Sequence, residues 1–322
     1  MKAYVYGANG PAITDVPKPS PKGTQVLVKV HACGLNRADL GMTKGHAHGS
    51  AGGVGTVLGI EWTGEIAELG PDAKGVKVGD KVMGSGGGAF AEYTVADHGR
   101  LFRTPSNMNF EEAATLPVAL STMHNAVVTN GALQPGQTVL IQGASSGVGL
   151  MAMQIAKLKG AKTVIGSSTD AMRRGRLKEF GADLAVDSSD PGWVDEVLKI
   201  TNGEGVDLIV DQVSGSVANQ NLKATRIKGR IVNVGRLGGT HGDFNFDLHA
   251  ARRIQYIGVT FRTRSVEEVR EIFEEVRKDI WPAVESRKLQ LPIDKVYAFD
   301  DIAKAFEHME ANKHLGKIVV TL

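Results

Sequence analysis

The segment TVLIQGASSGVGLMAMQIAKLKG, residues 138–160, constrains the fold of this chain more than any other stretch. An apolar run is followed by a cluster of small residues and then by an amphipathic pattern. This order predicts a strand, a tight turn and a helix. The first turn of such a helix presents free backbone N–H groups and the positive end of the helix dipole. Both favour a bound phosphate, so we expect a nucleotide phosphate at this turn.

The sequence on both sides of this segment repeats the alternation of strand and helix. The expected strands are 138–142, 162–166, 183–186, 206–211, 229–234 and 254–260. The expected helices are about 147–160, 170–180, 192–201, 215–224 and 247–253. Alternation of this kind produces a parallel sheet with helices on both faces. We therefore expect an α/β protein with a Rossmann doubly wound sheet.

The N-terminal third has a different pattern. Residues 1–115 contain short apolar or alternating runs separated by Gly, Pro and Asp, without long helical patterns, which indicates a compact β-rich domain. With 322 residues, the chain is long enough for two domains. After residue 264 a helix-rich segment follows and ends in the apolar strand pattern KIVVTL.

The turn departs from the strict dinucleotide fingerprint G-x-G-x-x-G, because its three glycine positions read Ala144, Ser146 and Gly149. Small residues at these positions still let a cofactor approach the backbone closely. A tight turn without a ligand is the alternative, but the surrounding alternation favours a dinucleotide. The residues expected to contact the cofactor here are Ala144, Ser145, Ser146, Gly147, Val148 and Gly149.

The end of the second strand distinguishes the two nicotinamide cofactors. NAD-binding proteins place a carboxylate there for the ribose 2′-OH, whereas this chain has Ser167 and Ser168, followed by Arg173 and Arg174. Hydroxyl and guanidinium groups accommodate a 2′-phosphate, so NADPH is the expected cofactor, with Ser167, Ser168 and Arg173 as contacts. Asp170 is expected to cap the next helix. Solvent-exposed helix charges are the alternative interpretation of the two arginines.

The chain resembles the zinc-free zeta-crystallin/quinone oxidoreductase branch of the medium-chain dehydrogenase/reductase superfamily. The motifs that carry the resemblance are CGLNRADL, LGIEWTGEI, LPVALSTMHNAV, GASSGVG, FRTRS and HMEANKHLGKIVV, which together span the whole chain. The resemblance implies a GroES-like catalytic domain at 1–116, a Rossmann domain at 117–260 and a return to the catalytic domain at 261–322.

The resemblance also makes a statement about zinc. Where zinc-dependent relatives have a cysteine and a histidine ligand, this chain has Asn36 and Ile60, and the four-cysteine structural lobe is missing. An amide and an isoleucine cannot complete a catalytic zinc site. His46 and His48, in a Gly-rich loop, are the remaining candidates, and they are better interpreted as solvated or pocket-lining side chains. We expect no metal.

The same resemblance implies roles for individual residues. Asn36 would hydrogen-bond a developing oxyanion, and Thr122 would lie beside the nicotinamide. The pocket for the substrate would include His46, His48, Glu61 and Phe261. Further cofactor contacts would come from Val234, Gly235, Arg262 and Lys317, with Lys317 near the adenosine phosphate. For Asp39 and Glu61, a buried structural role is the alternative.

These features favour an NADPH-dependent oxidoreductase that transfers a hydride to a quinone or another activated conjugated carbonyl. Without a Lewis acid, simple alcohol oxidation is a poor candidate, because nothing stabilises an alkoxide. Reduction of an enone or an enoyl thioester is the second interpretation. The third is an NADPH-binding protein with a structural, RNA-binding or sensor role.

Charge balance and apolar patterning restrict the classes of partner that this chain is expected to bind. The 37 Lys and Arg residues nearly balance 35 Asp and Glu residues, which is too even for a nucleic-acid partner. No apolar run approaches a membrane span, and the first residues lack the apolar stretch of a secretory signal. One cysteine, Cys33, fits a reducing compartment, so a cytoplasmic protein is expected. The apolar strand RIQYIGVTF is placed at a sheet edge and predicts a homodimer.

Overall fold

The computed structural model describes residues 1–49 and 52–322, which form two compact units. Unit 1 comprises Met1–Ser121 and Phe261–Leu322, and unit 2 comprises Thr122–Thr260. The first boundary was expected after residue 116, at the start of helix α3 (Pro117–His124), whereas the units divide within that helix.

Unit 2 is built on a six-stranded sheet in the order β11-β10-β9-β12-β13-β14, with every neighbouring pair parallel. This is the Rossmann order, in which the chain starts in the middle of the sheet and proceeds to each edge in turn. The strands are β9 (Thr138–Gln142), β10 (Thr163–Ser167), β11 (Leu184–Val186), β12 (Val206–Asp211), β13 (Thr225–Asn233) and β14 (Gln255–Gly258). All six expected strands are therefore present.

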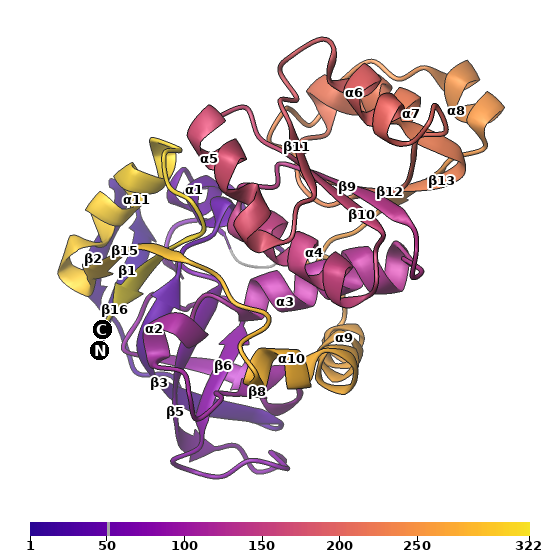
Figure 1. Ribbon diagram of the computed structural model, residues 1–322. Helices are drawn as coiled ribbons and strands as arrows, with labels where there is room; N and C mark the ends of the chain where they lie inside the picture. Colours follow the sequence, from indigo (N-terminus) through magenta and orange to yellow (C-terminus); the bar gives the residue numbers. More distant parts are fainter. Residues whose placement is uncertain (50–51) are drawn as a thin grey trace. The chain divides into compact units, whose positions relative to one another are not determined.

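Helices connect these strands, as the sequence predicted (Figure 1). They are α4 (Gly147–Leu158), α5 (Ala171–Arg176), α6 (Trp193–Ile200), α7 (Ala218–Ala224) and α8 (Phe246–Arg252). Helices α6 and α7 bury apolar side chains such as Trp193, Val197 and Leu222 against Ile209 and Ile231 of the sheet. Burying these side chains fixes the sheet and hence its carboxyl edge, where the turns that follow the strands gather.

Unit 1 contains the β-rich domain, which is mostly antiparallel. Its larger sheet has the order β15-β16-β3-β5-β6-β8, with β7 also paired to β3, and its smaller sheet has the order β2-β1-β4. The larger sheet has β3 (Gln25–Gly34), β5 (Glu61–Leu69), β6 (Lys81–Ser85), β7 (Tyr93–Asp97), β8 (Leu101–Arg103), β15 (Ile293–Ala298) and β16 (Lys317–Thr321). The smaller has β1 (Lys2–Gly7), β2 (Gly10–Asp15) and β4 (Thr56–Val57). The C-terminal strand β16 inserts beside β3, so this domain is closed by the end of the chain.

Helices cover unit 1 as well. They are α1 (Arg37–Thr43), α2 (Phe110–Ala113), the first part of α3, α9 (Val266–Asp279), α10 (Trp281–Glu285) and α11 (Ile302–Glu310). In α11, the residues at helical spacing, Ile302, Ala305, Phe306 and Met309, are all buried, which confirms the expected apolar face. The α/β fold class is thus confirmed, with a parallel sheet in one unit and a mixed β-rich domain in the other.

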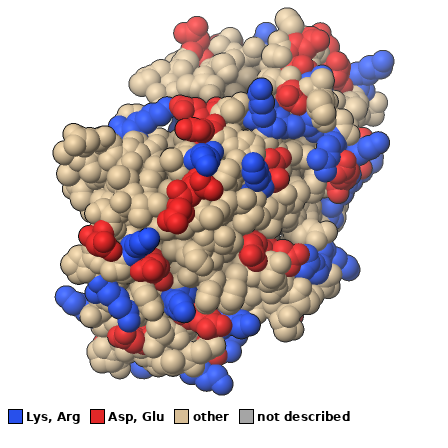
Figure 2. All heavy atoms as spheres, turned by 90° about the vertical axis from the view of Figure 1, so that its left-hand side faces the viewer, with Lys and Arg blue, Asp and Glu red and all other residues tan. Residues whose placement is uncertain are grey.

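Charged side chains are mixed on the surface. Figure 2 shows Lys and Arg interspersed with Asp and Glu across the face in view, without a continuous basic area. Among the described residues, no helix is long and apolar enough to cross a bilayer.

Candidate functional site

The turn between β9 and α4 is held tightly by backbone contacts. Gly143 adopts a positive φ of 70°, which a glycine accommodates without strain. Ser146 caps the helix, because its hydroxyl accepts a hydrogen bond from Gly149 N at 3.1 Å. A Cβ on Gly149 would lie 2.6 Å from both Ala144 Cα and Gly143 O, so only glycine fits there. The turn therefore has the shape that a phosphate-binding turn requires.

A buried amide beside this turn has donors that would suit a dinucleotide. Gln212 follows β12 directly and is almost fully buried, and its Oε1 accepts a hydrogen bond from the Ser146 hydroxyl at 3.1 Å. Its Nε2 has no hydrogen-bond partner. A buried amide with two unused N–H groups is costly unless a ligand accepts from it. The pyrophosphate or ribose oxygens of a dinucleotide would satisfy it, so these residues fit the expected cofactor.

Sequence reasoning missed Gln212. The available signal was its place immediately after the buried strand VDLIVD, at the same sheet edge as the turn after β9. Next to it, Val234 and Gly235 follow β13, and both of their backbone N–H groups donate to the Asp211 carbonyl oxygen. A Cβ on Gly235 would lie 2.7 Å from Gln212 O, so the two strand ends pack backbone against backbone.

The two serines at the end of β10 have different surroundings. The Ser168 hydroxyl donates to the Ser145 hydroxyl at 3.1 Å, which links the end of β10 to the turn before α4. Ser167, in contrast, has no exposed surface, and its hydroxyl donates to Gln142 Oε1 at 2.6 Å and accepts from Gly143 N at 3.0 Å. In this conformation Ser167 holds the two strand ends together and has no surface for a nucleotide phosphate, contrary to expectation.

The two arginines after β10 also differ. Arg174 Nη1 donates to the Ser168 carbonyl oxygen at 2.8 Å and pairs with Asp187 at 2.9 Å. Arg173 Nε lies 3.6 Å from Asp170, whose carboxylate accepts from Arg173 N and caps α5, as predicted. Hydrogen bonds from Ser189 and the charge of Arg174 lower the pKa of Asp187. Arg174 therefore reaches the end of β10, although Arg173 was the residue chosen from the sequence.

Unit 1 holds a buried ion pair beside Asn36. Lys317 Nζ donates to Glu61 Oε2 at 2.5 Å and to Asn36 Oδ1 at 2.9 Å. Glu61 Oε1 accepts from Val118 N at 2.7 Å, at the start of α3, where the helix dipole favours a carboxylate. Lys317 is 5% exposed and Glu61 is fully buried. The Glu61 carboxylate is therefore satisfied on both oxygens, as a buried charge requires.

The amide of Asn36 is fully used by this network. Its Nδ2 donates to Glu61 Oε2 at 2.9 Å and to Gly34 O at 3.2 Å, while its Oδ1 accepts from Lys317. An amide nitrogen has two hydrogens, so none remains for a substrate oxygen in this conformation. The expected oxyanion contact from Asn36 would require one of these bonds to break.

Lys317 has neighbours other than those expected. It was assigned to the adenosine phosphate, whereas the structure places its ammonium in unit 1 between Asn36 and Glu61. A Cβ on Gly34 would lie 2.8 Å from Glu61 Oε2 and 3.1 Å from Lys317 Cε, so this glycine makes room for the ion pair. No local sequence pattern indicates this pairing, because 256 residues separate the two partners.

Asp39 adds a second buried carboxyl group. Its Oδ2 accepts from Asn36 N at 2.8 Å at the start of α1, whereas its Oδ1 has no hydrogen-bond partner. Burial raises the pKa of Asp39 to about 7, more than the hydrogen bond from Asn36 and the charge of Lys317 lower it. The structural role that was weighed for Asp39 fits its place in the capping box of α1.

Three of the four expected substrate-pocket residues, His46, His48 and Phe261, lie on two segments that meet in unit 1, and the fourth, Glu61, begins β5. A Cβ on Gly49 would lie 3.1 Å from Arg262 O, so the loop carrying the histidines passes next to the segment after residue 260. Burial, and secondarily the charge of Arg262, lowers the pKa of His48. His46 is exposed, and Phe261 is half-buried. The loop continues into residues 50–51, which lie outside the described residues.

The remaining sequence expectations concern Thr122 and a metal. Thr122 is half-buried near the end of α3 and belongs to unit 2. In the part of the chain that the structure describes, no group of three or more His, Cys, Asp or Glu side chains is arranged to hold a metal ion. Cys33 is buried, and burial raises the pKa of its thiol well above the usual value.

Comparison with known proteins decides the family. Residues 22–106 match the alcohol dehydrogenase GroES-like domain, and residues 147–278 match the zinc-binding dehydrogenase family. A quinone oxidoreductase-like protein 2 homolog from Nematostella vectensis is 31% identical over 92% of this chain and 81% of its own length. The chain belongs to the medium-chain dehydrogenase/reductase superfamily. Within that superfamily it is similar to the quinone oxidoreductases, as its motifs predicted.

The chain is also similar to a polyketide synthase and to an enoyl reductase of known structure. A phenolphthiocerol/phthiocerol polyketide synthase protein of Mycobacterium tuberculosis is 30% identical over 96% of this chain. The chain spans only 14% of the length of that protein. The crystal structure of CurK enoyl reductase matches with a TM-score of 0.87 and 25% identity, over 99% of each chain. The match to the dehydrogenase family and the Rossmann sheet with its tight turn before α4 support a nicotinamide cofactor.

Proposed function

We propose that this medium-chain oxidoreductase is an NADPH-dependent reductase that transfers a hydride to a quinone or a similar conjugated carbonyl, without zinc. The observation that carries the proposal is the network of Asn36, Glu61 and Lys317 in unit 1. By the resemblance, Asn36 stands where zinc-dependent relatives have a cysteine ligand, and its amide is hydrogen-bonded to the Lys317–Glu61 ion pair. A conjugated acceptor delocalises the arriving charge itself, so it depends less on a Lewis acid than a simple alcohol does.

The residues of unit 2 support the cofactor part of the proposal. The reduced nicotinamide would supply the hydride, and the protein would bind and orient it. The start of α4 would hold the pyrophosphate through backbone N–H groups, and the unpaired Gln212 amide would donate to an adjoining oxygen. Ser168 and Arg174 would face the ribose 2′-phosphate, and Arg173 would add charge nearby.

In unit 1, the network would act by fixing Asn36. An amide with all of its hydrogen bonds made inside the protein has one orientation, and Lys317 sets which end is the oxygen. The ammonium has three N–H donors, of which Asn36 and Glu61 use two. We assign the Lys317–Glu61 pair as the positioning element of this site and Asn36 as the residue it positions.

Reduction of an enoyl thioester is the second candidate. It is favoured by the similarity to a polyketide synthase and to the CurK enoyl reductase structure. Both candidates need the same nicotinamide site, so only the acceptor distinguishes them. Turnover of 1,4-naphthoquinone, a simple enone and a crotonyl thioester, each with NADPH, separates them. Tight NADPH binding without turnover of any acceptor would contradict both and would favour a non-catalytic role.

The zinc-free part of the proposal has its own test. Exhaustive dialysis against a chelator, followed by elemental analysis and activity measurement, is expected to leave kcat unchanged. The Asn36→Cys variant, assayed with added zinc, tests whether a metal-binding donor at this position helps. Loss of activity on dialysis and its recovery with zinc would contradict the proposal.

The choice of NADPH is tested at the end of β10. We expect Arg174→Ala to reduce the NADPH-to-NADH affinity ratio more than Arg173→Ala does, because Arg174 reaches Ser168. Isothermal titration with each nucleotide gives both ratios. If neither variant changes the ratio, the 2′-phosphate site is elsewhere.

We further propose a homodimer through β14. This strand forms the edge of the parallel sheet, with β13 as its single neighbour among the described strands. An unpaired edge can take up a strand from a second copy. Sedimentation velocity of the wild type and of a variant with a proline at Ile257 tests this, and a monomeric wild type would contradict it.

A further inference from the structure

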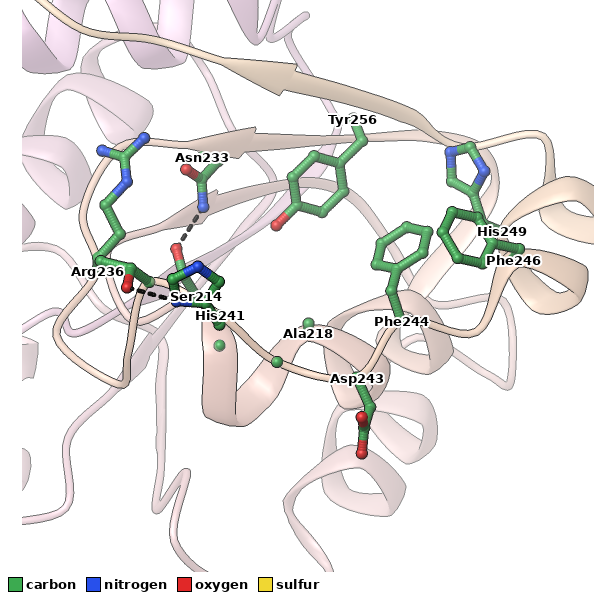
Figure 3. Close-up of a pocket in the computed structure, with 13 residues that line it drawn as sticks. Ser214, Ala218, Asn233, Arg236, His241, Asp243, Phe244, Phe246, His249 and Tyr256 are labelled. Atoms are coloured by element: carbon green, nitrogen blue, oxygen red, sulfur yellow. Dashed lines mark hydrogen bonds between the residues drawn. The ribbon is translucent and has the colours of Figure 1, made fainter.

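Unit 2 contains a cavity that no part of the proposed reaction uses. It has a volume of about 490 Å³ and lies between the edge of the sheet, helices α7 and α8, and the loop that follows β13. Figure 3 shows that its lining has two parts, with aromatic rings at one end and polar side chains at the other. A volume of this size is typical of small-molecule sites.

The aromatic part is a set of rings in edge-to-face contact. Phe244 contacts Tyr256 with ring centroids 5.7 Å apart and an interplanar angle of 83°, and Phe246 with centroids 5.0 Å apart. Phe246 is 75% exposed and Tyr256 is 37% exposed. In a single copy of the chain these rings are open to water and available to a ligand. Flat aromatic ligands suit such rings best.

The polar part is built from buried and basic side chains. Asn233 and Ser214 are both buried, and the Asn233 amide donates to the Ser214 hydroxyl, which itself donates to Gly235 O at 2.5 Å. Arg236 and His241 lie at the same end of the cavity in Figure 3. The single acidic residue of the lining, Asp243, points away from the cavity in that view. Arg236 therefore offers an exposed guanidinium to an anionic group on the ligand, while the buried Asp211 carboxylate interacts electrostatically with both Arg236 and Tyr256.

The wall formed by the loop is rigid because glycines let backbones touch. A Cβ on Gly215 would lie 3.0 Å from Gly239 O, and closer still to the carbonyl oxygen of His241. A Cβ on Gly242 would lie 2.9 Å from the carbonyl carbon of Gly215. Gly238 N also donates to Val213 O at 2.7 Å. The loop is thus fixed against the segment before α7, which gives the cavity a preformed shape.

Ser214, which lines this cavity, has a strained backbone conformation. Ser214 adopts φ 63° and ψ −121°, a conformation in the positive-φ region that non-glycine residues rarely occupy. Its strain is held by hydrogen bonds from Val213 and Ser214 N–H groups to the Asp211 carboxylate and by the Ser214 hydroxyl bond to Gly235. Strained residues of this kind concentrate at functional sites.

We propose that this cavity binds a planar aromatic carboxylate of one or two fused rings. The rings would lie against Phe244 and Tyr256, and the carboxylate would face Arg236 and His241. Arg236 Nη1 donates to Val234 O at 3.0 Å, and the exposed remainder of the guanidinium would bind the carboxylate. The lining residues are not themselves proposed to hold the dinucleotide, but Ser214 and Arg236 hydrogen-bond the carbonyl oxygens of Gly235 and Val234, which are expected cofactor contacts.

The test uses two probes of the same shape on the full-length protein. Naphthalene-2-carboxylate and the neutral naphthalene-2-methanol are titrated by calorimetry into wild type and into Arg236→Gln. We expect saturable binding of the carboxylate and about tenfold weaker carboxylate binding by Arg236→Gln, since that variant removes a charge-assisted hydrogen bond. Binding of the neutral probe should not change in this variant. Phe244→Leu should weaken both probes.

The matched control is Arg176→Gln, which removes an arginine that pairs with Glu179 on the surface of the same unit. It should leave both affinities unchanged. The proposal is overturned if neither probe saturates, if Arg236→Gln affects both probes equally, or if Arg176→Gln acts like Arg236→Gln. Competitive displacement of the probe by NADPH would assign the cavity to the cofactor instead. Loss of probe binding upon self-association, with recovery in a monomeric variant, would assign it to a second copy.

Discussion

The candidate functional residues of unit 1 and those of unit 2 satisfy their polar groups in opposite ways. In unit 1, Lys317, Glu61 and Asn36 make their hydrogen bonds to one another, so the network is complete without a ligand. In unit 2, the Gln212 amide nitrogen is buried without a partner, next to the residue that caps the N-terminus of α4. A network in which every hydrogen bond is made fixes its side chains, whereas a network with unused donors can bind a ligand. Substitutions in unit 1 should therefore mainly lower the free energy of unfolding, and substitutions in unit 2 should mainly lower the affinity for NADPH.

The largest effect is expected from Lys317→Met. It leaves the fully buried Glu61 without its cation, and breaking such a pair costs about 3–5 kcal/mol of unfolding free energy. Urea unfolding followed by circular dichroism gives the value. Lys304→Met is the matched control, because Lys304 pairs with Asp301 on the surface and its loss should cost at most about 1 kcal/mol. Equal losses in the two variants would show that the network is not closed.

A second substitution at Lys317 distinguishes a role in positioning Asn36 from a role in folding. If Lys317 acts through Asn36, then Lys317→Arg should retain the fold and recover part of kcat, since a guanidinium can donate to both partners. KM for NADPH should stay unchanged in both variants, because the network belongs to unit 1. A change confined to KM for NADPH would instead return Lys317 to the adenosine phosphate, where the sequence placed it.

The next effect concerns Asp39. Its pKa is raised to about 7 in the folded protein from an ordinary value near 3.8, so the folded state binds a proton that the unfolded state has lost. Below pH 4 this residue makes no difference, and between pH 4 and pH 7 it increasingly destabilises the fold. The full cost above pH 7 is up to about 4 kcal/mol. Asp39→Asn should therefore be most stabilising above pH 7, as measured by urea midpoints from pH 4 to pH 8.

Asp97 provides the control of opposite sign. Burial alone would raise its pKa, but hydrogen bonds from Arg270 and Thr24 and from Gly99 N lower it to about 2. Its stabilising contribution is present above pH 4 and is lost as the pH falls toward 2. Asp97→Asn should therefore destabilise the protein at neutral pH. If both asparagine variants shift stability in the same direction at pH 8, the burial of Asp39 does not control its titration.

Unit 2 is tested first at its turn. A Cβ at Gly149 would lie 2.6 Å from Ala144 Cα, so Gly149→Ala should cost about 1–3 kcal/mol and weaken NADPH binding by distorting the phosphate turn. Gly175 is the control, because nothing lies near its Cβ position in α5. Gly175→Ala should instead stabilise the protein by about 0.5–1 kcal/mol. NADPH binding by calorimetry and thermal unfolding measure both variants.

The smallest effect on stability is expected from Gln212→Met. Replacing a buried, unpaired amide by an apolar side chain of similar size should leave the unfolding free energy of the apoprotein unchanged or slightly higher. The affinity for NADPH should fall about tenfold, because one donor to the dinucleotide is lost. Gln154→Met, whose amide donates to Leu150 O within α4, is the control. Unchanged nucleotide affinity in Gln212→Met would remove Gln212 from the site.

The parts of this molecule that periodicity determines could be predicted from the sequence. The six strands of unit 2 and the apolar face of α11 follow from the spacing of apolar residues, which repeats every two residues in a strand and every 3.6 in a helix. They could therefore be located from local sequence alone. The small residues before α4 likewise reveal a turn through their own steric requirements. The capping of α5 by Asp170 was predicted because a helix start is a local event.

Side-chain partners at the candidate site could not be predicted from the sequence, because they depend on how the strands and helices come together. Ser167 and Ser168 are adjacent and both buried, but their hydroxyls have different partners: Ser167 donates to Gln142 in β9, and Ser168 donates to Ser145 in the turn before α4. Arg174 donates to the Ser168 carbonyl oxygen at the strand end, a contact that the sequence alone does not indicate. Lys317 finds Glu61 only after β16 has inserted beside β3, so that pairing is a product of topology.

The glycine contacts beneath the loop after β13 have a practical consequence for protein engineering. Because Gly215 and Gly242 touch through their main chains, insertions or larger residues there would displace the whole wall. Attempts to reshape the cavity for other molecules should therefore vary Phe244, Phe246 and Tyr256 and keep the main chain as a constant template. Libraries restricted to those three positions should yield folded proteins far more often than libraries that include the glycines.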